Sequence, residues 1–344
     1  MPYFHAAASA AASNAESSPA RIGVLIVNLG TPDAPTYFAV QRYLREFLSD
    51  RRVIETCRLI WLPLLFGVVL PFRPLRTARN YQKIWMQDGS PLAVYSRRLS
   101  AKIETLLRPG FEDRLRVRLA MTYGNPSIAS AIQSFAEQGV AKLIVLPLYP
   151  QYCSSTTGSV FDGTQHALRR WRRLPEIRFI NDYHDDDGYI DALTAKIRPH
   201  WNAGGEASHL LFSYHGIPAS YVAKGDPYQR QAEATTRLVA ARLGLLEGQW
   251  SHCYQSRFGK VPWITPYTID VIKQLADRGV RRITVASPSF AVDCLETLEE
   301  VAMEYAARFK AWGGEQLTLV PCLNDDDDHA RALAELIRSR MPAA

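Results

Sequence analysis

The stretch ASAIQSFAEQGVAKLIVLPLYP, residues 129–150, has a counterpart later in the chain, IDVIKQLADRGVRRITVASPSF, residues 269–290. Both begin with apolar residues at helical spacing, pass through Gly-Val and a basic residue, and continue as an aliphatic run that reaches a proline. A glycine after a helical pattern is typical of a helix C-cap, and an apolar run without alternation indicates a strand buried on both faces. Two similar domains explain this repeat. The alternative, that any two helix–strand units look alike, stays open.

The same succession of strand and helix patterns extends over most of the chain. Helical patterns cover 127–139 and 266–279, and the clearest apolar runs cover 22–30, 118–126, 142–150, 177–183, 209–216 and 281–290. The repeated order of strand, loop, helix and strand predicts an α/β fold with parallel sheets flanked by helices.

The predicted domain organisation has a boundary near residue 175. The first domain covers 21–175, the second covers 176–325, and a C-terminal helix over 327–341 joins the first domain. Residues 1–20 are rich in Ala and Ser and contain no Lys or Arg, so we expect a disordered tail rather than a secretory signal. The acidic runs at 185–187 and 325–328 precede helical patterns, where capping and the helix dipole explain them.

Length and composition are those of a globular protein. The chain has 344 residues, 47% of them hydrophobic and 22% charged, which suits two domains of ordinary size. The net charge of +6 is modest and no basic block carries interleaved aromatic residues, so we expect no nucleic-acid partner. The cysteines are widely spaced and form no CxxC pair, which favours reduced thiols in the cytoplasm.

The stretch LIWLPLLFGVVLPF at 59–72 raises the question of membrane contact. It has 14 residues, fewer than the roughly 20 that a spanning helix needs, and Pro63 and Pro71 interrupt it. Two interpretations stay open: a buried core helix, or an exposed apolar lip that touches a bilayer or covers an apolar ligand. Four arginines flank the stretch: Arg58, Arg73, Arg76 and Arg79. We expect the protein to lie in the cytoplasm. Whether it also contacts the inner membrane peripherally through 59–72 stays open.

Several common active-site motifs are absent from the sequence. No G-x-G-x-x-G follows the first apolar run and no G-x-x-x-x-G-K-[ST] occurs, so the usual phosphate cradles of dinucleotide and nucleoside triphosphate enzymes are missing. No H-E-x-x-H and no G-x-S-x-G occurs either, which disfavours zinc proteases and α/β-hydrolases.

The candidate site comprises residues that follow the apolar runs, because ligands of open parallel sheets bind beyond the carboxyl ends of the strands. His215 has such a position, and so does DCLETLEE at 293–300. If a helix begins near 293, Glu296 and Glu300 are i,i+4 neighbours, and stacked carboxylates favour protons or cations. Together these groups predict acid–base or metal chemistry at a cleft between two domains. A histidine in a structural hydrogen bond and a solvated acidic helix face are the alternatives.

Seven ordered blocks resemble the ferrochelatase family, the terminal enzymes of haem synthesis. They are VLIVNLGTPDAPT (24–36), YQKIWMQDGSPL (81–92), MTYGNPS (121–127), LPLYPQYCSSTTGS (146–159), LLFSYHGIPASYVAKGDPY (210–228), YQSRFGKVPWITP (254–266) and AVDCLETLEEV (291–301). The resemblance implies a lyase that inserts Fe²⁺ into protoporphyrin IX to give protohaem. It also implies two similar Rossmann-like domains with the active site in the cleft between them.

The resemblance further implies roles for individual residues. His215 matches the family's essential histidine and Glu296 its essential glutamate, so both are predicted to be catalytic and metal-binding. Glu300 and Asp293 extend the acidic row as a predicted proton or metal relay. The predicted porphyrin-binding residues are Leu29, Tyr123, Trp263, Ser155 and Thr156. A histidine near neutrality accepts a pyrrole proton or contacts the metal, and carboxylates pass protons out or iron in.

Three departures from the family pattern bear on these roles. Cys294 replaces a histidine that many relatives have two residues before the glutamate, which puts a second histidine ligand in doubt. Thr122 replaces an arginine before the pocket tyrosine, so propionate groups must be anchored elsewhere. Animal members hold an iron–sulfur cluster on one cysteine near the STTGS stretch and on three clustered C-terminal cysteines. This chain has Ser154 at the first of these positions and only Cys322 in its C-terminal part. We therefore expect no cluster and no permanently bound cofactor, with iron as a substrate only.

Three alternatives to this function stay open. The substrate of the enzyme could be coproporphyrin III, although NLGTPDAPT and MTYGNPS resemble the branch that uses protoporphyrin. Another tetrapyrrole metal chelatase, such as one for cobalt, typically has several metal-binding histidines, and only His215 lies in a suitable motif here. A non-enzymatic haem carrier would need no acidic row.

Overall fold

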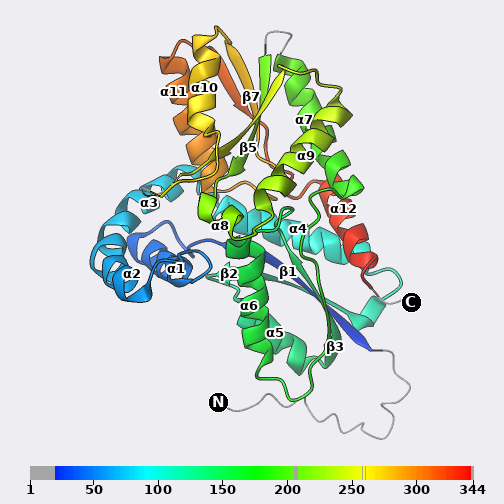
Figure 1. Ribbon diagram of the computed structural model, residues 1–344. Helices are drawn as coiled ribbons and strands as arrows, with labels where there is room; N and C mark the ends of the chain where they lie inside the picture. Colours follow the sequence, from blue (N-terminus) through cyan, green and yellow to red (C-terminus); the bar gives the residue numbers. More distant parts are fainter. Residues whose placement is uncertain (1–19, 205–207, 258, 260, 342–344) are drawn as a thin grey trace, which may run out of the picture.

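The computed structural model describes residues 20–204, 208–257, 259 and 261–341. Two parallel sheets, each covered by helices, form two domains that lie one above the other in Figure 1. The expected tail at 1–20 lies outside the described residues, except for Ala20.

The first sheet has the strand order β2–β1–β3–β4, and all neighbouring strands are parallel. Its strands are β1 (Arg21–Gly30), β2 (Leu115–Tyr123), β3 (Val140–Pro147) and β4 (Glu176–Phe179). In β1 the residues from Ile22 to Asn28 are buried without interruption, as expected of a strand covered on both faces.

The second sheet repeats this order as β6–β5–β7–β8, again with parallel neighbours. Its strands are β5 (Ser208–His215), β6 (Trp250–Gln255), β7 (Arg282–Ala286) and β8 (Gln316–Leu319). In each sheet the strand of the repeated stretch, β3 or β7, pairs with β1 or β5. The two copies of the repeat thus occupy equivalent positions, and the predicted α/β class with two similar domains is confirmed.

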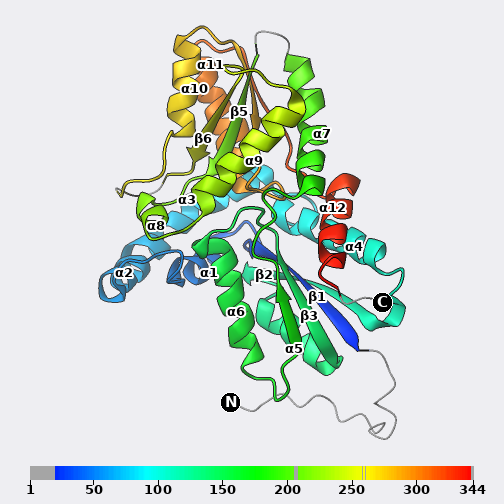
Figure 2. The same cartoon turned by 45° about the vertical axis from the view of Figure 1, so that its right-hand side comes forward.

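Helices cover the faces of both sheets (Figure 2). The helices on the first sheet are α4 (Pro91–Leu107), α5 (Ile128–Glu137) and α6 (Ser159–Leu168). Those on the second are α7 (Asp187–Gly204), α9 (Tyr228–Leu243), α10 (Thr268–Asp277) and α11 (Ala306–Ala311). The expected helices at 127–139 and 266–279 are α5 and α10. A glycine with a positive φ angle follows the end of each helix, Gly139 at 67° and Gly279 at 84°. Residues with a side chain rarely adopt a positive φ angle.

The remaining elements are shorter or lie beside the sheets. They are α1 (Tyr37–Ser49), α2 (Arg58–Leu64), η1 (Leu65–Val69), α3 (Leu70–Ile84), η2 (Glu112–Arg114), η3 (Ser154–Gly158), α8 (Ala219–Ala223), η4 (Glu296–Tyr305) and α12 (Asp327–Arg338). Of these, η1, η3 and η4 are π-helical and η2 is a 3₁₀ turn.

At the edges of the sheets, some strands were not among the predicted apolar runs, and the first sheet extends beyond the predicted domain boundary. β6 has the sequence WSHCYQ, and only its last three residues are buried, because it is an edge strand with one neighbour. Edge strands such as β6 and β8 lack the aliphatic run by which the central strands were predicted. β4 pairs with β3, so the first sheet continues past the expected boundary at residue 175.

The C-terminal helix α12 contacts α4 of the first domain and α7 of the second. Lys102 of α4 lies 2.7 Å from Asp327, and Lys196 of α7 lies 2.7 Å from Asp326. The acidic run at 325–328 therefore binds lysines of both domains, and Asp326 makes no side-chain cap bond to the helix. Capping and the helix dipole, as expected from the sequence, therefore leave these two lysine contacts unexplained.

A continuous helix of 27 residues, Arg58–Ile84, comprises α2, η1 and α3. Among the helices of the described residues, it alone is long and apolar enough to cross a membrane by length and composition, with a mean hydropathy of 1.5. The expectation of a short, interrupted stretch is therefore wrong. Pro63 and Pro74 lie inside the helix, because each proline removes a single N–H donor and the other backbone bonds continue the helix.

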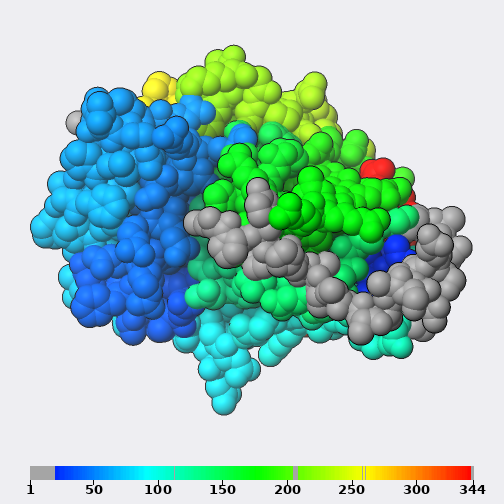
Figure 3. Space-filling model, turned by 90° about the horizontal axis from the view of Figure 1, so that it is seen from below, coloured from blue at the N-terminus to red at the C-terminus, as the bar shows by residue number. Residues whose placement is uncertain are grey.

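One face of this helix is buried and the other is open. Leu65 and Leu70 pack in an apolar cluster with residues of α1, whereas Leu59 and Phe72 are 86% and 73% exposed. The exposed apolar residues of the helix, here called the apolar lip, are Leu59, Ile60, Leu64, Phe66, Val68, Phe72 and Leu75. Figure 3 shows the blue segment that contains this helix at one side of the molecule, beside the green part of the first domain.

Candidate active site

His215 is the last residue of β5, at the carboxyl end of an inner strand of the second sheet. Its backbone N–H donates to Ser289 Oγ at 3.1 Å, and its Nδ1 lies 2.6 Å from the carbonyl oxygen of Gly216. A carbonyl oxygen can only accept, so Nδ1 carries the proton in this bond and Nε2 of the neutral ring keeps its lone pair. The histidine is therefore oriented to act as a base or a metal ligand through Nε2.

Two aromatic rings flank His215. The ring centroids of Trp263 and Phe290 each lie 6.3 Å from that of the histidine. Gly216 permits this approach, because a Cβ atom there would come within 3.1 Å of the Trp263 ring and 2.9 Å of the Gln255 carbonyl oxygen. The structure thus brings together His215 and Trp263, two of the predicted site residues.

Glu296 is the first residue of η4, which differs from the expected helix in two ways. The helical segment begins two residues later than 293, and it is a π-helix rather than an α-helix. A π-helix is rare in proteins and frequently occurs at functional sites. Glu299, in the same turn, lies 2.7 Å from Lys83 of α3 and is only 13% exposed, so a solvated acidic face does not describe η4.

Glu300 lies on the part of η4 that faces the second sheet. Its Oε1 accepts hydrogen bonds from the Ser256 N–H at 3.0 Å and the Tyr305 hydroxyl at 2.5 Å, and its Oε2 accepts from Ser256 Oγ. Burial raises the pKa of Glu300, and these hydrogen bonds oppose that shift. The charges of His215 and Glu296 also act on this pKa, which indicates that the three groups share one electrostatic environment.

Gln255 and Ser256, at the end of β6, connect the histidine to the acidic helix. Gln255 Nε2 donates to the backbone carbonyl of Glu296 at 3.0 Å, and Gln255 Oε1 accepts from Ser213 Oγ at 2.6 Å. Neither residue was among the predicted site residues, although both lie in the quoted block YQSRFGKVPWITP. Their position at the end of a strand would have indicated a site role if β6 had carried an aliphatic run.

Asp293 has surroundings unlike those expected of a relay residue. It is 3% exposed, and its carboxylate accepts from Thr297 Oγ1 at 3.0 Å, Cys322 N at 3.2 Å and Asn324 Nδ2 at 2.7 Å. These donors belong to the backbone or to neutral side chains that hold the start of η4. The contacts favour a positioning role for Asp293.

An apolar cluster lies on the first-domain side of η4. Leu29 at the end of β1 and Tyr123 at the end of β2 share this cluster with Leu295 and Leu298. The Tyr123 hydroxyl donates to Asp50 Oδ2 at 2.7 Å, so the ring packs in the cluster while its polar end points toward α1. Two predicted porphyrin-binding residues therefore lie beside the helix that carries Glu296.

Tyr81 of α3 belongs to the same apolar cluster. Burial and the nearby charge of Glu296 raise its pKa, so its hydroxyl keeps its proton near neutrality. Burial lowers the pKa of Arg73, also on α3, and the charge of Glu296 opposes that effect. The long helix thus contributes a phenol and a guanidinium to the surroundings of Glu296.

Ser155 and Thr156 belong to a different part of the structure. They lie on η3, where Ser155 Oγ is 3.1 Å from Cys153 Sγ and Thr156 Oγ1 donates to the Cys153 carbonyl at 3.3 Å. These bonds are local to the π-helical turn that leads into α6. The structure does not link the two hydroxyls to His215 or Glu296 by any hydrogen bond among the described residues.

A separate cavity of about 430 Å³ lies between the end of β2 and α6. Its lining residues are Asp50, Thr122, Tyr123, Ser159, Asp162, Gly163, Gln165, His166 and Arg169. Tyr123 therefore has its ring in the apolar cluster beside η4 and also borders this cavity.

Comparison with known proteins shows the family of the chain. The Ferrochelatase family model matches residues 21–341. The ferrochelatase of Thioalkalivibrio sulfidiphilus is 48% identical over 320 residues, which cover 93% of this chain and 87% of the relative. The ferrochelatase of Vibrio parahaemolyticus is 47% identical over 319 residues, which cover 93% of this chain and 98% of the relative.

Solved structures with a similar fold include SirB and CbiX. SirB from Bacillus subtilis with Fe³⁺ has a TM-score of 0.56 at 11% identity, over 93% of this chain and 95% of that one. CbiX, the terminal enzyme for biosynthesis of siroheme in denitrifying bacteria, has a TM-score of 0.50 at 14% identity, over 93% and 100% of the two chains. At these identities the likeness concerns the fold alone.

Proposed function

Because the chain belongs to the ferrochelatase family, lyases that insert ferrous iron into a porphyrin, we propose that its porphyrin is protoporphyrin IX and that His215 and Glu296 carry out the insertion. One observation carries the assignment of the pair. His215 and Glu296 come from different elements, β5 and η4, and the buried side chain of Gln255 is bonded to both elements.

The reaction requires that two pyrrole N–H protons leave as one Fe²⁺ enters, so a proton acceptor must face the macrocycle. His215 meets this need, because its Nδ1 proton is engaged with Gly216 and its Nε2 lone pair is available. Trp263 beside the histidine offers a flat apolar face, which suits contact with a bent macrocycle. We assign acceptance of the first pyrrole proton to Nε2 of His215.

The carboxylates have the complementary task of passing protons out or iron in. Glu296 begins η4 and Glu300 follows one turn later, where Ser256 and Tyr305 hold its carboxylate in a fixed orientation. Imidazole together with carboxylate binds non-haem Fe²⁺ in proteins. We therefore assign the metal contact to His215 and Glu296, and the outer relay to Glu300, with Asp293 positioning the helix.

The apolar cluster around Leu29 and Tyr123 supports a porphyrin with few peripheral carboxylates. Protoporphyrin IX carries two propionates and coproporphyrin III carries four, so the second substrate would require more polar partners at the cleft. Ser155 and Thr156 stay proposed porphyrin contacts, with less support, since their hydroxyls bond within η3.

The test is porphyrin absorbance during anaerobic addition of Fe²⁺ to the purified chain, with protoporphyrin IX, coproporphyrin III and sirohydrochlorin in parallel. We expect the highest kcat/KM with protoporphyrin IX. A higher value with either other tetrapyrrole would refute the substrate assignment. Haem binding without any conversion of porphyrin would favour the haem carrier.

We also propose that the chain holds no iron–sulfur cluster and no other resident cofactor. The Cys153 thiol is hydrogen-bonded to the Ser155 hydroxyl, and the backbone N–H of Cys322 donates a hydrogen bond to the Asp293 carboxylate. Burial raises the pKa of the Cys153 thiol to about 12 and that of Cys322 well above its usual value, which opposes the thiolate that a cluster requires. Acid-labile sulfide at one cluster per chain would contradict this proposal.

A further proposal concerns location: a cytoplasmic protein that contacts the inner membrane peripherally through the apolar lip. The exposed side chains Leu59 and Phe72 support it, since large exposed apolar surfaces mark contact sites. In sedimentation with anionic phospholipid vesicles, Leu59→Ser with Phe72→Ser should reduce binding. Leu246→Ser is the matched control, because Leu246 is 70% exposed outside the lip. Equal loss in the control would refute the lip as the contact surface.

A further inference from the structure

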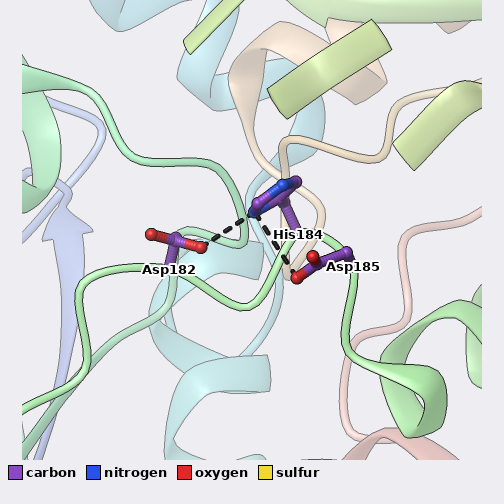
Figure 4. Close-up of side chains that lie close together, drawn as sticks. All are labelled: Asp182, His184 and Asp185. Atoms are coloured by element: carbon purple, nitrogen blue, oxygen red, sulfur yellow. Dashed lines mark hydrogen bonds and ion pairs between the residues drawn. The ribbon is translucent and has the colours of Figure 1, made fainter. Parts of the chain in front are cut away.

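A group of three metal-ligating side chains lies on the segment between β4 and α7, apart from His215 and Glu296. Asp182, His184 and Asp185 each offer one ligand atom, and these atoms all lie within 4.8 Å of one another (Figure 4). His184 Nδ1 is 2.8 Å from Asp182 Oδ1 and 3.7 Å from Asp185 Oδ1. Both carboxylates therefore converge on one ring nitrogen.

The three acidic residues at 185–187, which were expected from the sequence to favour the start of a helix, make different contacts in the structure. Asp186 Oδ1 accepts the N–H of Tyr189 at 3.0 Å and so caps α7, and Asp187 forms an ion pair with Arg242 at 2.5 Å. Asp185 instead turns toward His184, although its side chain is 65% exposed and could extend into water. Capping therefore explains one member of the run, an ion pair with Arg242 explains the second, and the third is left to the histidine.

The distances suit a metal ion. A Zn²⁺ ion bonds to histidine nitrogen and carboxylate oxygen at about 2.0–2.2 Å, which separates neighbouring ligand atoms by roughly 3–3.5 Å. The observed separations of 2.8 and 3.7 Å lie on either side of that range. With a neutral imidazole the two carboxylates give a charge that a divalent cation balances, and imidazole with carboxylate suits first-row ions.

The second domain holds this segment in position. Thr235 Oγ1 of α9 donates to the His184 carbonyl at 2.7 Å. The pKa of Asp182 is lowered by its hydrogen bond with His184, and a hydrogen bond from Gln231 of α9 adds to that effect. Gln231 is itself fixed, since its Oε1 accepts the Tyr152 N–H at 2.6 Å. Outer contacts of this kind orient metal ligands in proteins.

We propose that Asp182, His184 and Asp185 form a second metal site, which takes a divalent first-row transition ion such as Zn²⁺ or Co²⁺, with water completing the coordination. The ion takes the place of the proton that Nδ1 shares with Asp182. If the His184 imidazole is neutral before the ion binds, its proton moves from Nδ1 to Nε2. If the imidazole is protonated on both nitrogens, the Nδ1 proton is released to solvent. Because the three ligands lie within four consecutive positions of the segment through which the chain passes from the first sheet to the second, the bound ion fixes the conformation of that segment.

The experiment is a Zn²⁺ titration by calorimetry of the full chain carrying His215→Ala, which removes the histidine of the proposed cleft site. We expect one ion per chain, bound more weakly as pH falls. Adding His184→Ala or Asp185→Asn should weaken binding by at least about ten-fold, the scale found when even an outer partner of a metal site is lost. The Co²⁺ form should lose its visible absorption bands with His184→Ala.

The control is His200→Ala in the same background, a histidine of α7 outside the group, which should leave Zn²⁺ affinity unchanged. Because Asp185 is largely exposed, Asp185→Asn tests the site even if His184→Ala does not fold. No Zn²⁺ binding by the His215→Ala chain, or equal affinity in all these variants, would overturn the proposal. Turnover with porphyrin should persist in Asp185→Asn, so failure here leaves the proposed function untouched.

Discussion

Gln255 donates its side-chain N–H to the backbone carbonyl oxygen of Glu296 at 3.0 Å. The other end of the same amide accepts from Ser213, two residues before His215, at 2.6 Å. Gln255 is 2% exposed, so water does not compete for either bond. The relative position of the proposed catalytic pair therefore depends on one buried amide that takes no part in the chemistry.

Gln255→Leu should lower both stability and turnover. It leaves the Glu296 carbonyl and the Ser213 hydroxyl without this partner, and a buried unsatisfied polar group costs about 1–3 kcal/mol. We expect the free energy of unfolding in urea to fall by that amount, and kcat to fall while KM changes little. Gln133→Leu, on the exposed face of α5, is the control and should change neither quantity. An unchanged kcat in a folded Gln255→Leu chain would argue against the positioning role.

His215→Ala should abolish iron insertion without unfolding the chain. The ring contributes little to the core, since His215 is only partly buried at the end of its strand. The measurements are anaerobic porphyrin metallation and circular dichroism. Wild-type turnover by a natively folded His215→Ala chain would remove the central assignment.

Glu296→Gln should reduce insertion by about two or more orders of magnitude while porphyrin binding persists, because the change removes charge and basicity but keeps volume. Glu300→Gln should cost less, since the new amide can still accept from the Ser256 N–H and donate to Ser256 Oγ. Glu299→Gln, which loses only the ion pair with Lys83, should cost least. Steady-state rates and porphyrin affinity for the three variants test this order. Equal, near-wild-type rates would show that the row has no kinetic role.

Glu300→Gln should also change the pH dependence of stability. Burial raises the pKa of Glu300 in the folded chain, so its carboxyl favours folding below about pH 4.3, its usual pKa, and that contribution is lost as pH rises through the raised value. The variant should therefore have a higher melting temperature than the wild type at pH 7 and the same one at pH 4. Melting curves at both pH values test this, and a variant that is less stable at pH 7 would contradict it.

Acid should destabilise the fold through buried histidines. Burial lowers the pKa of His209, His252 and His329 to about 4 each. The unfolded chain binds these protons below about pH 6.5, so stability is fully present above that value and is lost as pH falls toward 4. The free energy of unfolding should decline over this window. His252→Phe, whose ring can pack between Tyr214 and Tyr254, should make the decline shallower, and an identical slope would contradict the explanation.

The positions of the central strands along the chain and the glycines that follow two helices were predictable because both depend on local sequence. The run at 142–150 is aliphatic because β3 is buried on both faces, and Gly139 follows α5 because the chain there adopts a positive φ. The edge strand β6 was missed for the opposite reason. One side of its backbone has no strand neighbour, half of its residues are only partly buried, and WSHCYQ carries no aliphatic run.

The sequence by itself determined the α/β class, the repeat and the position of His215 at the end of a strand, since neighbouring residues decide each of these. Only the tertiary structure decided which polar groups meet. Gln255 and Glu296 are 41 positions apart, and their contact exists because the end of β6, which lies beside β5, comes next to the start of η4. In the same way, the acidic run at 185–187 divides among a cap, an arginine and a histidine because α9 packs against α7. Contacts of this kind depend on how whole elements pack, and a local pattern of residues does not carry that information.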